Sequence, residues 1–237
     1  MPGHFTFYCN KIENGVAFFD EVEAKHAIQV LRYSVGDEIH FTDGQGLHMR
    51  GAIETANKNG FQARITESIV VERPAELHLF MAILKAGDRM EWACEKITEL
   101  GASSLTLFQS DHGERGKVNI ERMKKVALSA MKQSHGAWMP KIEVHTFKEA
   151  VELFATLDSK YIAYCGDGEK SDMMSLRLPS AIMIGPEGDF STNEIEDAIQ
   201  KMLNNNIRRL LILDDEKLVG VITQTDLASY LRDQILV

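Results

Sequence analysis

The sequence lacks the features that mark membrane, secreted and metal-binding proteins. Its 237 residues contain no run of 18 apolar residues, which argues against a membrane-spanning helix. The segment from Met1 to Phe5 has neither a basic nor an apolar stretch, so we expect no secretory signal. The three cysteines are widely spaced and odd in number, which favours reduced thiols and a cytoplasmic location. The eight histidines show no metal-ligand spacing, so no metal site is predicted.

A basic excess is also missing. The net charge is −9, whereas a protein that neutralises nucleic-acid phosphates usually carries a surplus of Lys and Arg. One local concentration of positive charge surrounds a single acid, Glu121, and consists of Arg115, Lys117, Arg122, Lys124, Lys125 and Lys132. Two interpretations of this cluster stay open. It is either the solvated face of a helix or a footprint on an RNA backbone.

The most informative segment runs from Ile184 to Ser191 and reads Ile-Gly-Pro-Glu-Gly-Asp-Phe-Ser. An apolar strand enters a turn flanked by Gly185 and Gly188, which can adopt backbone angles closed to other residues and let the main chain lie against a ligand. Ser191 and Glu194 have the spacing of a capping box, which predicts a helix start beside the turn. The segment therefore indicates a small-molecule site, and the alternative is a tight turn without a ligand.

Residues 4–73 are short, alternating extended segments, and they predict a small β-barrel. Asn14-Gly15 and Asn59-Gly60 are expected hairpin turns, because both residues of each pair tolerate positive φ. A helix is expected over residues 21–31. Its buried side is expected to comprise Val22, Ala27, Val30 and Leu31.

After Pro74 strands alternate with long helices, which predicts a parallel sheet and an α/β fold. The expected strands are 77–84, 105–108, 161–165 and 181–184, and the expected helices are 89–100 and 120–134. Ligands bind beyond the carboxyl ends of the strands in such sheets. Lys85, Gly166 and the loop that begins at Gly185 all fall at such ends.

An ordered series of motifs covers about the first 190 residues. It comprises Glu23 to His26, Val30 to Arg32, Lys85 to Glu91, Glu95 to Gly101, Ala130 to Ser134 and Ile184 to Ser191. The series resembles the bacterial 16S ribosomal RNA uridine-N3 methyltransferases, and its order is more specific than any one motif. The resemblance implies a PUA-like RNA-binding β-barrel over residues 1–73 and a SPOUT-type α/β methyltransferase domain over residues 74–190. It also implies S-adenosylmethionine as cofactor, 16S rRNA of the small ribosomal subunit as partner, and a homodimer.

The reaction that this resemblance implies transfers a methyl group to N3 of a uridine, a poor nucleophile until its proton is lost. The expected cofactor-binding residues are Ile184, Gly185, Pro186, Glu187, Gly188 and Gly166. Lys85, Arg89 and Lys96 are candidates for stabilising the uridine anion or a phosphate. Glu99 is either a base or the ion-pair partner of a nearby Lys. No general base is assigned.

The expected RNA contacts are Arg32, Arg115, Lys117, Lys124 and Gln133. Two of them have a second interpretation. Arg32 is either an RNA contact or a surface side chain that interacts with the carbonyl groups at a helix C-terminus. Gln133 either hydrogen-bonds the base or cofactor, or caps a neighbouring loop.

The resemblance changes at about residue 191. The family's closing segment, which forms a trefoil knot and completes the cofactor pocket, has no counterpart in this sequence, and Asp189 stands where the family has a second glycine. Residues 191–237 instead resemble a single CBS motif, a βαβ-type tail with strands expected at 207–215 and 218–223. This resemblance implies an adenine nucleotide at Thr223 and Asp226, unless Thr223 merely caps a helix. The alternative function is a catalytically inactive RNA-binding or nucleotide-sensing protein.

Overall fold

The computed structural model describes residues 5–74, 76–113, 118–157, 159–163, 178–191, 193–194, 197–198, 209–214 and 217–223. The chain divides into two compact units. Unit 1 comprises Met1–Pro74, Thr98–Gly101 and Lys125–Met139, and unit 2 comprises Ala75–Ile97, Ala102–Lys124 and Pro140–Val237. Over the described ranges, every helix is too short or too polar to pass through a membrane.

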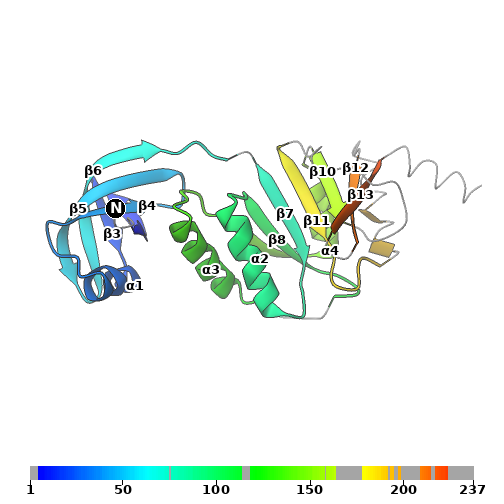
Figure 1. Cartoon of the computed structure of the whole chain (residues 1–237), viewed down its shortest axis with the longest axis horizontal. Coiled ribbons are helices and arrows are strands. Elements are labelled where there is room, and N and C mark those ends of the chain that lie inside the picture. The colour runs from blue at the N-terminus through cyan, green and yellow to red at the C-terminus, as the bar shows by residue number, and fades with distance from the viewer. Residues whose placement is uncertain are drawn as a thin grey trace, which may run out of the picture. The chain divides into compact units, whose positions relative to one another are not determined.

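Unit 1 contains a curled six-stranded sheet with the strand order β1-β4-β5-β6-β3-β2 (Figure 1). The strands are β1 (Thr6–Tyr8), β2 (Lys11–Glu13), β3 (Val16–Phe19), β4 (Glu38–Thr42), β5 (Leu47–Asn57) and β6 (Gly60–Val70). Only β1 and β4 pair in parallel. The core is rich in aromatic rings, and Phe19 stacks on Phe61 with ring centroids 4.1 Å apart. The curled sheet confirms the expected barrel-like N-terminal half.

The two expected hairpins form by different means. Asn14 and Gly15 both have positive φ, 48° and 74°, and they join β2 to β3 as predicted. The prediction for the second turn was wrong by one residue, because Asn57 already pairs with Gly60. Gly60 belongs to the strand and lacks a positive φ. Glycine is required at position 60 for another reason: a Cβ there would lie 2.5 Å from the carbonyl oxygen of Phe19.

The expected helix over residues 21–31 starts as α1 (Glu21–Ala24) and continues as the π-helical turn η1 (Lys25–Val30). Its predicted buried side was partly wrong, since Val22 and Val30 are 73% and 63% exposed. The wider π turn, closed by the bond from Leu31 N to His26 O, changes which side chains face the barrel. Glu23 is buried instead, with 3% exposure.

A segment distant in sequence completes unit 1. Gly46 N donates a backbone bond to Ala137 O at 2.8 Å, and the indole Nε1 of Trp138 donates to Val71 O at 3.2 Å. The guanidinium of Arg73 lies 5.0 Å from the Trp138 ring centroid, within the range of a cation–π interaction. In the same unit, Lys132 donates to the buried carboxylate of Glu23. The helix that ends at residue 133 is thus tied at its C-terminal half to the barrel.

Unit 2 contains a seven-stranded sheet with the order β13-β12-β10-β11-β7-β8-β9. Its strands are β7 (Leu77–Ala82), β8 (Ser104–Gln109), β9 (Lys141–Thr146), β10 (Ser159–Ala163), β11 (Ser180–Ile184), β12 (Arg209–Asp214) and β13 (Lys217–Thr223). All neighbours pair in parallel except β12 and β13. This arrangement confirms the α/β fold with a parallel sheet.

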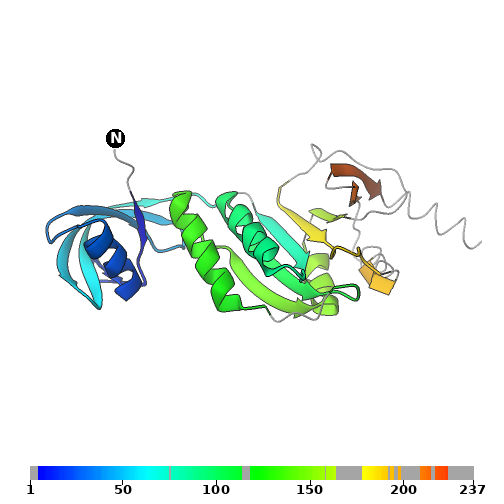
Figure 2. The same cartoon turned by 60° about the horizontal axis from the view of Figure 1, so that its bottom comes forward.

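Helices cover this sheet. α2 (Gly87–Glu99) and α3 (Ile120–Gln133) lie side by side in two views (Figures 1 and 2), and they match the predicted helices within about two residues. α4 (Phe147–Ala155) packs its Phe154 against Phe80 and its Phe147 against Phe108 of the sheet. β9 and α4 were not predicted. β9 is an edge strand of mixed polarity, and α4 begins with a capping box at Thr146 and Glu149.

The C-terminal strands were predicted as a pair, and the structure shows them as an antiparallel hairpin. β12 also pairs in parallel with β10, where Ala163 lies opposite Leu211, so the hairpin extends the sheet of unit 2. The second helix expected in the tail, together with Asp226, lies outside the described residues. The three-part division of the chain at residues 73 and 190 stays a prediction.

Replacing Gly46 with Ala is expected to destabilise unit 1 by about 3 kcal/mol. A Cβ there would lie 2.3 Å from Trp138 Cζ2, and its φ of +105° is unfavourable for alanine. Urea unfolding followed by circular dichroism measures the change. Gly15→Ala is the matched control, because its φ is +74° but nothing lies within 4 Å, so only a backbone cost of about 1 kcal/mol is expected. Equal losses in both variants would contradict the importance of the Trp138 contact.

Candidate functional site

The candidate site lies where three neighbouring parallel strands end. β11 pairs with β7 and β7 pairs with β8, so the loops that follow them leave the same edge of the sheet. The loop after β11 begins at Gly185, the loop after β8 contains Ser110 to Gly113, and Lys85 follows β7. This is the edge at which open parallel sheets bind ligands.

The loop after β11 folds back on its own strand. Asp189 N donates to Pro186 O at 2.9 Å and closes a tight turn. The next side chain, Phe190, is buried and lies nearly parallel to the ring of Phe108. A Cβ on Gly185 would lie 3.1 Å from the Phe190 ring, so close approach of this ring explains the glycine. Phe190 thus fixes the inner side of the loop, while Glu187 and Gly188 are exposed.

The expected backbone angles of the two glycines were wrong. Neither Gly185 nor Gly188 has a positive φ, whereas Asp189 has a φ of 59°. Asp tolerates this left-handed region better than most residues, and its Oδ1 accepts from Phe190 N at 2.8 Å. The left-handed position of this loop is therefore residue 189, where the sequence resemblance predicts a second glycine. The sequence departs from the family there by a substitution that the backbone accommodates.

Three main-chain N–H groups of this loop have no acceptor in the part of the chain that the structure describes. Among the described residues, none accepts a hydrogen bond from the N–H groups of Gly185, Glu187 or Gly188. Pro186 has no N–H to satisfy. Backbone N–H groups are strong donors that require a partner when water is excluded. The loop therefore presents three donors on one short segment to a ligand.

Glu194 links this loop to the one after β8. The predicted capping box is confirmed, since Ser191 N donates to Glu194 Oε2 at 2.9 Å and Glu194 N donates to Ser191 Oγ at 3.2 Å. Glu194 is only 4% exposed and also accepts from Ser110 Oγ at 3.1 Å and Asp111 N at 3.0 Å. Sequence reasoning missed this second pair of contacts, because 83 or more positions separate the partners.

His112 makes a second link between the two loops. Its Nδ1 lies 3.2 Å from both Gly188 O and Asp189 O, although the imidazole is exposed. Beside it, Ser191 Oγ donates to Asp111 Oδ2 at 2.8 Å. No sequence signal pointed to His112, because a lone histidine in a loop has no characteristic spacing.

The candidates for charge stabilisation lie in different places. Lys85 is exposed just after β7, and Arg89 is exposed in the first turn of α2, which starts from that edge. Lys96 is half-buried and donates to Glu95 Oε1 at 2.7 Å. Glu99 lies in the last turn of α2, from which the chain enters the amino end of β8. The first two thus lie near the carboxyl ends of the strands, whereas α2 carries Glu99 toward the opposite ends.

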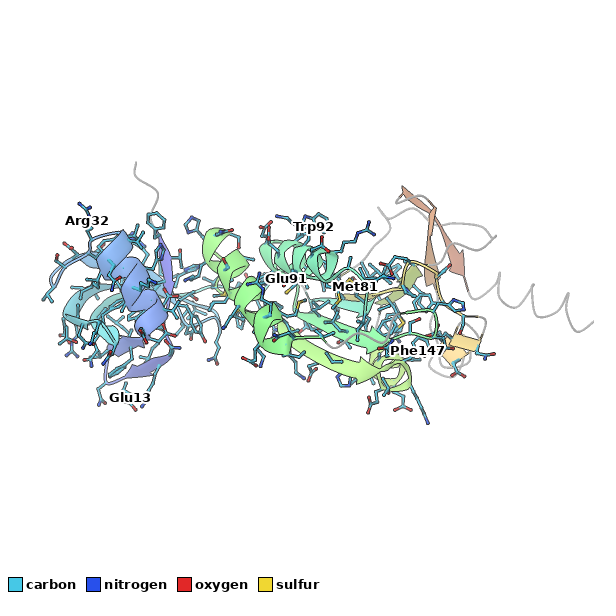
Figure 3. All side chains as sticks on the ribbon, turned by 90° about the horizontal axis from the view of Figure 1, so that it is seen from below. Glu13, Arg32, Met81, Glu91, Trp92 and Phe147 are labelled. Carbon is cyan, nitrogen blue, oxygen red and sulfur yellow. The ribbon has the colours of Figure 1, made fainter. Side chains whose placement is uncertain are left out.

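The expected RNA contacts are only partly described. Arg32 is exposed, with a φ of 62°, and it projects outward from its unit in Figure 3. It bonds to none of the described residues, so the contact with helix carbonyls is not observed. Gln133 is exposed as the last residue of α3. Arg115, Lys117 and Gly166 lie outside the described residues.

Part of the basic cluster is neutralised within the chain. Lys124 donates to Glu121 at 3.1 Å, and Arg122 makes two bonds of 2.7 and 2.9 Å to Glu91. The hydrogen bonds from Arg122 lower the pKa of Glu91. Lys132 is paired to the buried Glu23, so three residues of the cluster have carboxylate partners within the chain. The choice between a solvated helix face and an RNA footprint stays a prediction.

Replacing Glu194 with Ala is expected to destabilise the chain by about 3 kcal/mol, since three donors lose their acceptor. Glu194→Gln keeps one acceptor oxygen and should lose less than half of that. Thermal and urea unfolding measure both variants. Glu187→Ala, at an exposed position of the loop after β11, is the control and should change stability by less than about 0.5 kcal/mol. An unchanged Glu194→Ala protein would show that the buried carboxylate does not join the loops.

Position 189 should prefer glycine to alanine. Asp189→Ala loses the bond to Phe190 N and keeps the left-handed backbone, so a loss of about 1–2 kcal/mol is expected. Asp189→Gly loses the same bond but removes the steric cost, so its stability should stay within about 0.5 kcal/mol of the parent. The difference between their melting temperatures tests the prediction, and an alanine variant as stable as the glycine variant would refute it.

Comparison with known proteins agrees with this geometry. A family model described as an RNA methyltransferase domain matches residues 71–207, and one described as an RNA methyltransferase PUA domain matches residues 19–66. A CBS domain model matches residues 188–233, as the C-terminal motif predicted. The methyltransferase and CBS matches overlap over the segment that contains the capping box at Ser191 and Glu194.

Individual relatives extend over most of the chain. Ribosomal RNA small subunit methyltransferase E of Bacillus subtilis is 26% identical over 191 residues, which are 73% of this chain and 75% of the relative. The crystal structure of a probable rRNA-methyltransferase from Porphyromonas gingivalis is 30% identical, with a TM-score of 0.75 over 98% of this chain and 96% of that one. A ribosomal RNA small subunit methyltransferase E from Neisseria gonorrhoeae bound to S-adenosyl methionine shares the fold, with a TM-score of 0.72 at 21% identity over 99% of this chain and 98% of that one.

These matches confirm the resemblance found in the ordered motifs of the first 190 residues. The methyltransferase model alone spans more than half of the sequence. The chain therefore belongs to the RNA methyltransferase family.

Proposed function

We propose that this protein transfers a methyl group from S-adenosylmethionine to N3 of a uridine in 16S rRNA of the small ribosomal subunit. The observation that carries the proposal is the loop from Gly185 to Asp189 at the carboxyl edge of the sheet, where three backbone N–H groups have no acceptor among the described residues. Curated relatives named ribosomal RNA small subunit methyltransferase E support the RNA substrate.

The residues present suit the cofactor. Gly185, Glu187 and Gly188 offer N–H groups to polar atoms of a ligand. Their loop is anchored where Phe190 stacks on Phe108 and where Ser191 N donates to Glu194. Such preorganisation reduces the entropy that binding would otherwise cost. When bound, S-adenosylmethionine supplies an electrophilic methyl group on a sulfonium. The similar structure from Neisseria gonorrhoeae, which has S-adenosyl methionine bound, supports the assignment.

The substrate requires positioning and charge control. Uridine N3 lies on the pairing edge of the base, so the base has to be unpaired or extruded before it reaches the loop. Lys85 and Arg89 carry positive charge near the loop after β7 and can stabilise the uridine anion or a neighbouring phosphate. In unit 1, exposed Arg32 is the proposed contact to the RNA backbone.

Two measurements test the function. Isothermal titration should show S-adenosylmethionine binding, and ATP in its place should give no comparable heat. With small ribosomal subunits that lack the modification, labelled methyl should enter 16S rRNA and arrest reverse transcription at one uridine, because N3 methylation blocks base pairing. Heat with ATP alone would instead favour the nucleotide-sensing alternative.

A glycine variant connects this function to the loop. Gly185→Ala places a Cβ 3.1 Å from the Phe190 ring, so the loop has to shift and cofactor affinity should fall about tenfold or more, equivalent to about 1.4 kcal/mol. Gly87→Ala is the matched control, because nothing lies within 4 Å of its Cβ and it should bind normally. Equal affinity of both variants would exclude this loop as the cofactor site.

A further inference from the structure

We propose that His112 is the base that removes the proton from uridine N3. This inference rests on the proposed function, and it fills a role that the sequence motifs leave without a residue. His112 follows β8 at the carboxyl edge of the sheet and touches the loop to which we assign the cofactor. It is the described histidine that bonds to the backbone of that loop.

The hydrogen bonds of His112 determine which ring nitrogen can act. Nδ1 lies 3.2 Å from two carbonyl oxygens, those of Gly188 and Asp189. A carbonyl oxygen only accepts, so Nδ1 carries the hydrogen in this arrangement. In the neutral ring Nε2 is then unprotonated and carries a lone pair. The backbone thereby holds the histidine in the tautomer that a base requires.

Nε2 is also accessible. The side chain is exposed, and none of the described residues hydrogen-bonds to Nε2 or forms an ion pair with the ring. A Cβ built on Gly188 would lie 3.3 Å from His112 Cβ, so the histidine packs directly against the loop. Because the side chain is exposed, Nε2 is open to a substrate base brought beside this loop.

Among the described residues, the charged groups closest to His112 in the two loops are carboxylates. From its own loop, Asp111 accepts from Ser191 Oγ. From the facing loop, Asp189 accepts from Phe190 N, and from the helix start beyond it Glu194 accepts from three donors. Glu187 is exposed on the same loop. None of these carboxylates blocks Nε2, and the Nδ1 bonds persist when Nε2 gains a proton, so the ring need not reorient.

The other candidates are less suited to this step. Lys85, Arg89 and Lys96 are donors in their protonated forms, so they stabilise an anion but do not accept its proton. Glu99 lies in the last turn of α2, at the end of the helix away from Lys85. Among the described candidates, His112 combines a lone pair on Nε2 with direct contact to the loop that begins at Gly185.

The N–H bond at N3 breaks and its proton moves to Nε2, which forms an imidazolium. The electron pair left on N3 attacks the methyl carbon, and the C–S bond breaks with its electrons going to sulfur, so the sulfonium becomes a neutral thioether. The imidazolium then releases its proton to water. The carbonyls of Gly188 and Asp189 hold the ring throughout, as an acceptor at Nδ1 does in other histidine bases.

The discriminating variant is His112→Asn. The Asn amide can place an N–H near the position of Nδ1 and keep the bonds to the loop, but it has no nitrogen in place of Nε2. Single-turnover methyl transfer is measured with the full chain, saturating S-adenosylmethionine and unmodified small ribosomal subunits. The wild-type rate should fall on acidification, because a protonated histidine cannot accept the proton from N3, and it should level off at higher pH. The His112→Asn rate at pH 7 should be lower by about 10²- to 10⁴-fold and should keep rising above pH 8.

Cofactor affinity from isothermal titration provides the control, and it should be the same for wild type and His112→Asn. As a second measurement, added imidazole should partly restore transfer by His112→Ala and not by wild type. A wild-type rate and pH profile in His112→Asn would overturn the role of His112 and leave it as a residue that only positions the loop. Absence of transfer by the wild-type chain, with cofactor binding intact, would instead count against the proposed function.

Discussion

The buried carboxylate of Glu194 is the constraint on which the geometry of the site depends. A charged group that loses contact with water has to be compensated by donors, and Glu194 takes them from two loops that are remote in sequence. The positions of Ser110 and Asp111 relative to Ser191 follow from this requirement. Because His112 comes directly after Asp111, its approach to the Gly188 carbonyl depends on the same group. A capping residue of one helix thus also fixes the neighbouring loop.

Local signals in the sequence predicted the elements well. The apolar strands of unit 2, the two long helices and the capping box at Ser191 each depend on residues a few positions apart, so their patterns are visible without the fold. β9 was missed because an edge strand with charged residues has weak alternation. The buried face of the helix after Asp20 was predicted only in part, because a π turn and the partner of Glu23, far along the chain, decide which side is covered.

Site residues were harder to predict, because they depend on contacts between loops. The motif located the Gly185 loop correctly, but it attributed its special backbone to the glycines, whereas Asp189 has the left-handed angle. His112 carried no signal at all, since its importance arises only from two carbonyls 76 and 77 positions away. Charge patterning left two interpretations of the basic cluster around α3, and the bonds of Arg122 and Lys124 to carboxylates are compatible with both.

The pairing of β12 with β10 makes the C-terminal hairpin part of the sheet of unit 2. An open parallel sheet has two edges, and an uncovered edge is a template for association with other chains. Here β10 has β11 on one flank and β12 on the other, and β13 closes the hairpin beyond it. Truncating the chain before residue 209 would strip one flank of β10 and leave its backbone groups unpaired. The resulting fragment would be prone to aggregate, so loss of activity after such a deletion would not identify a regulatory module.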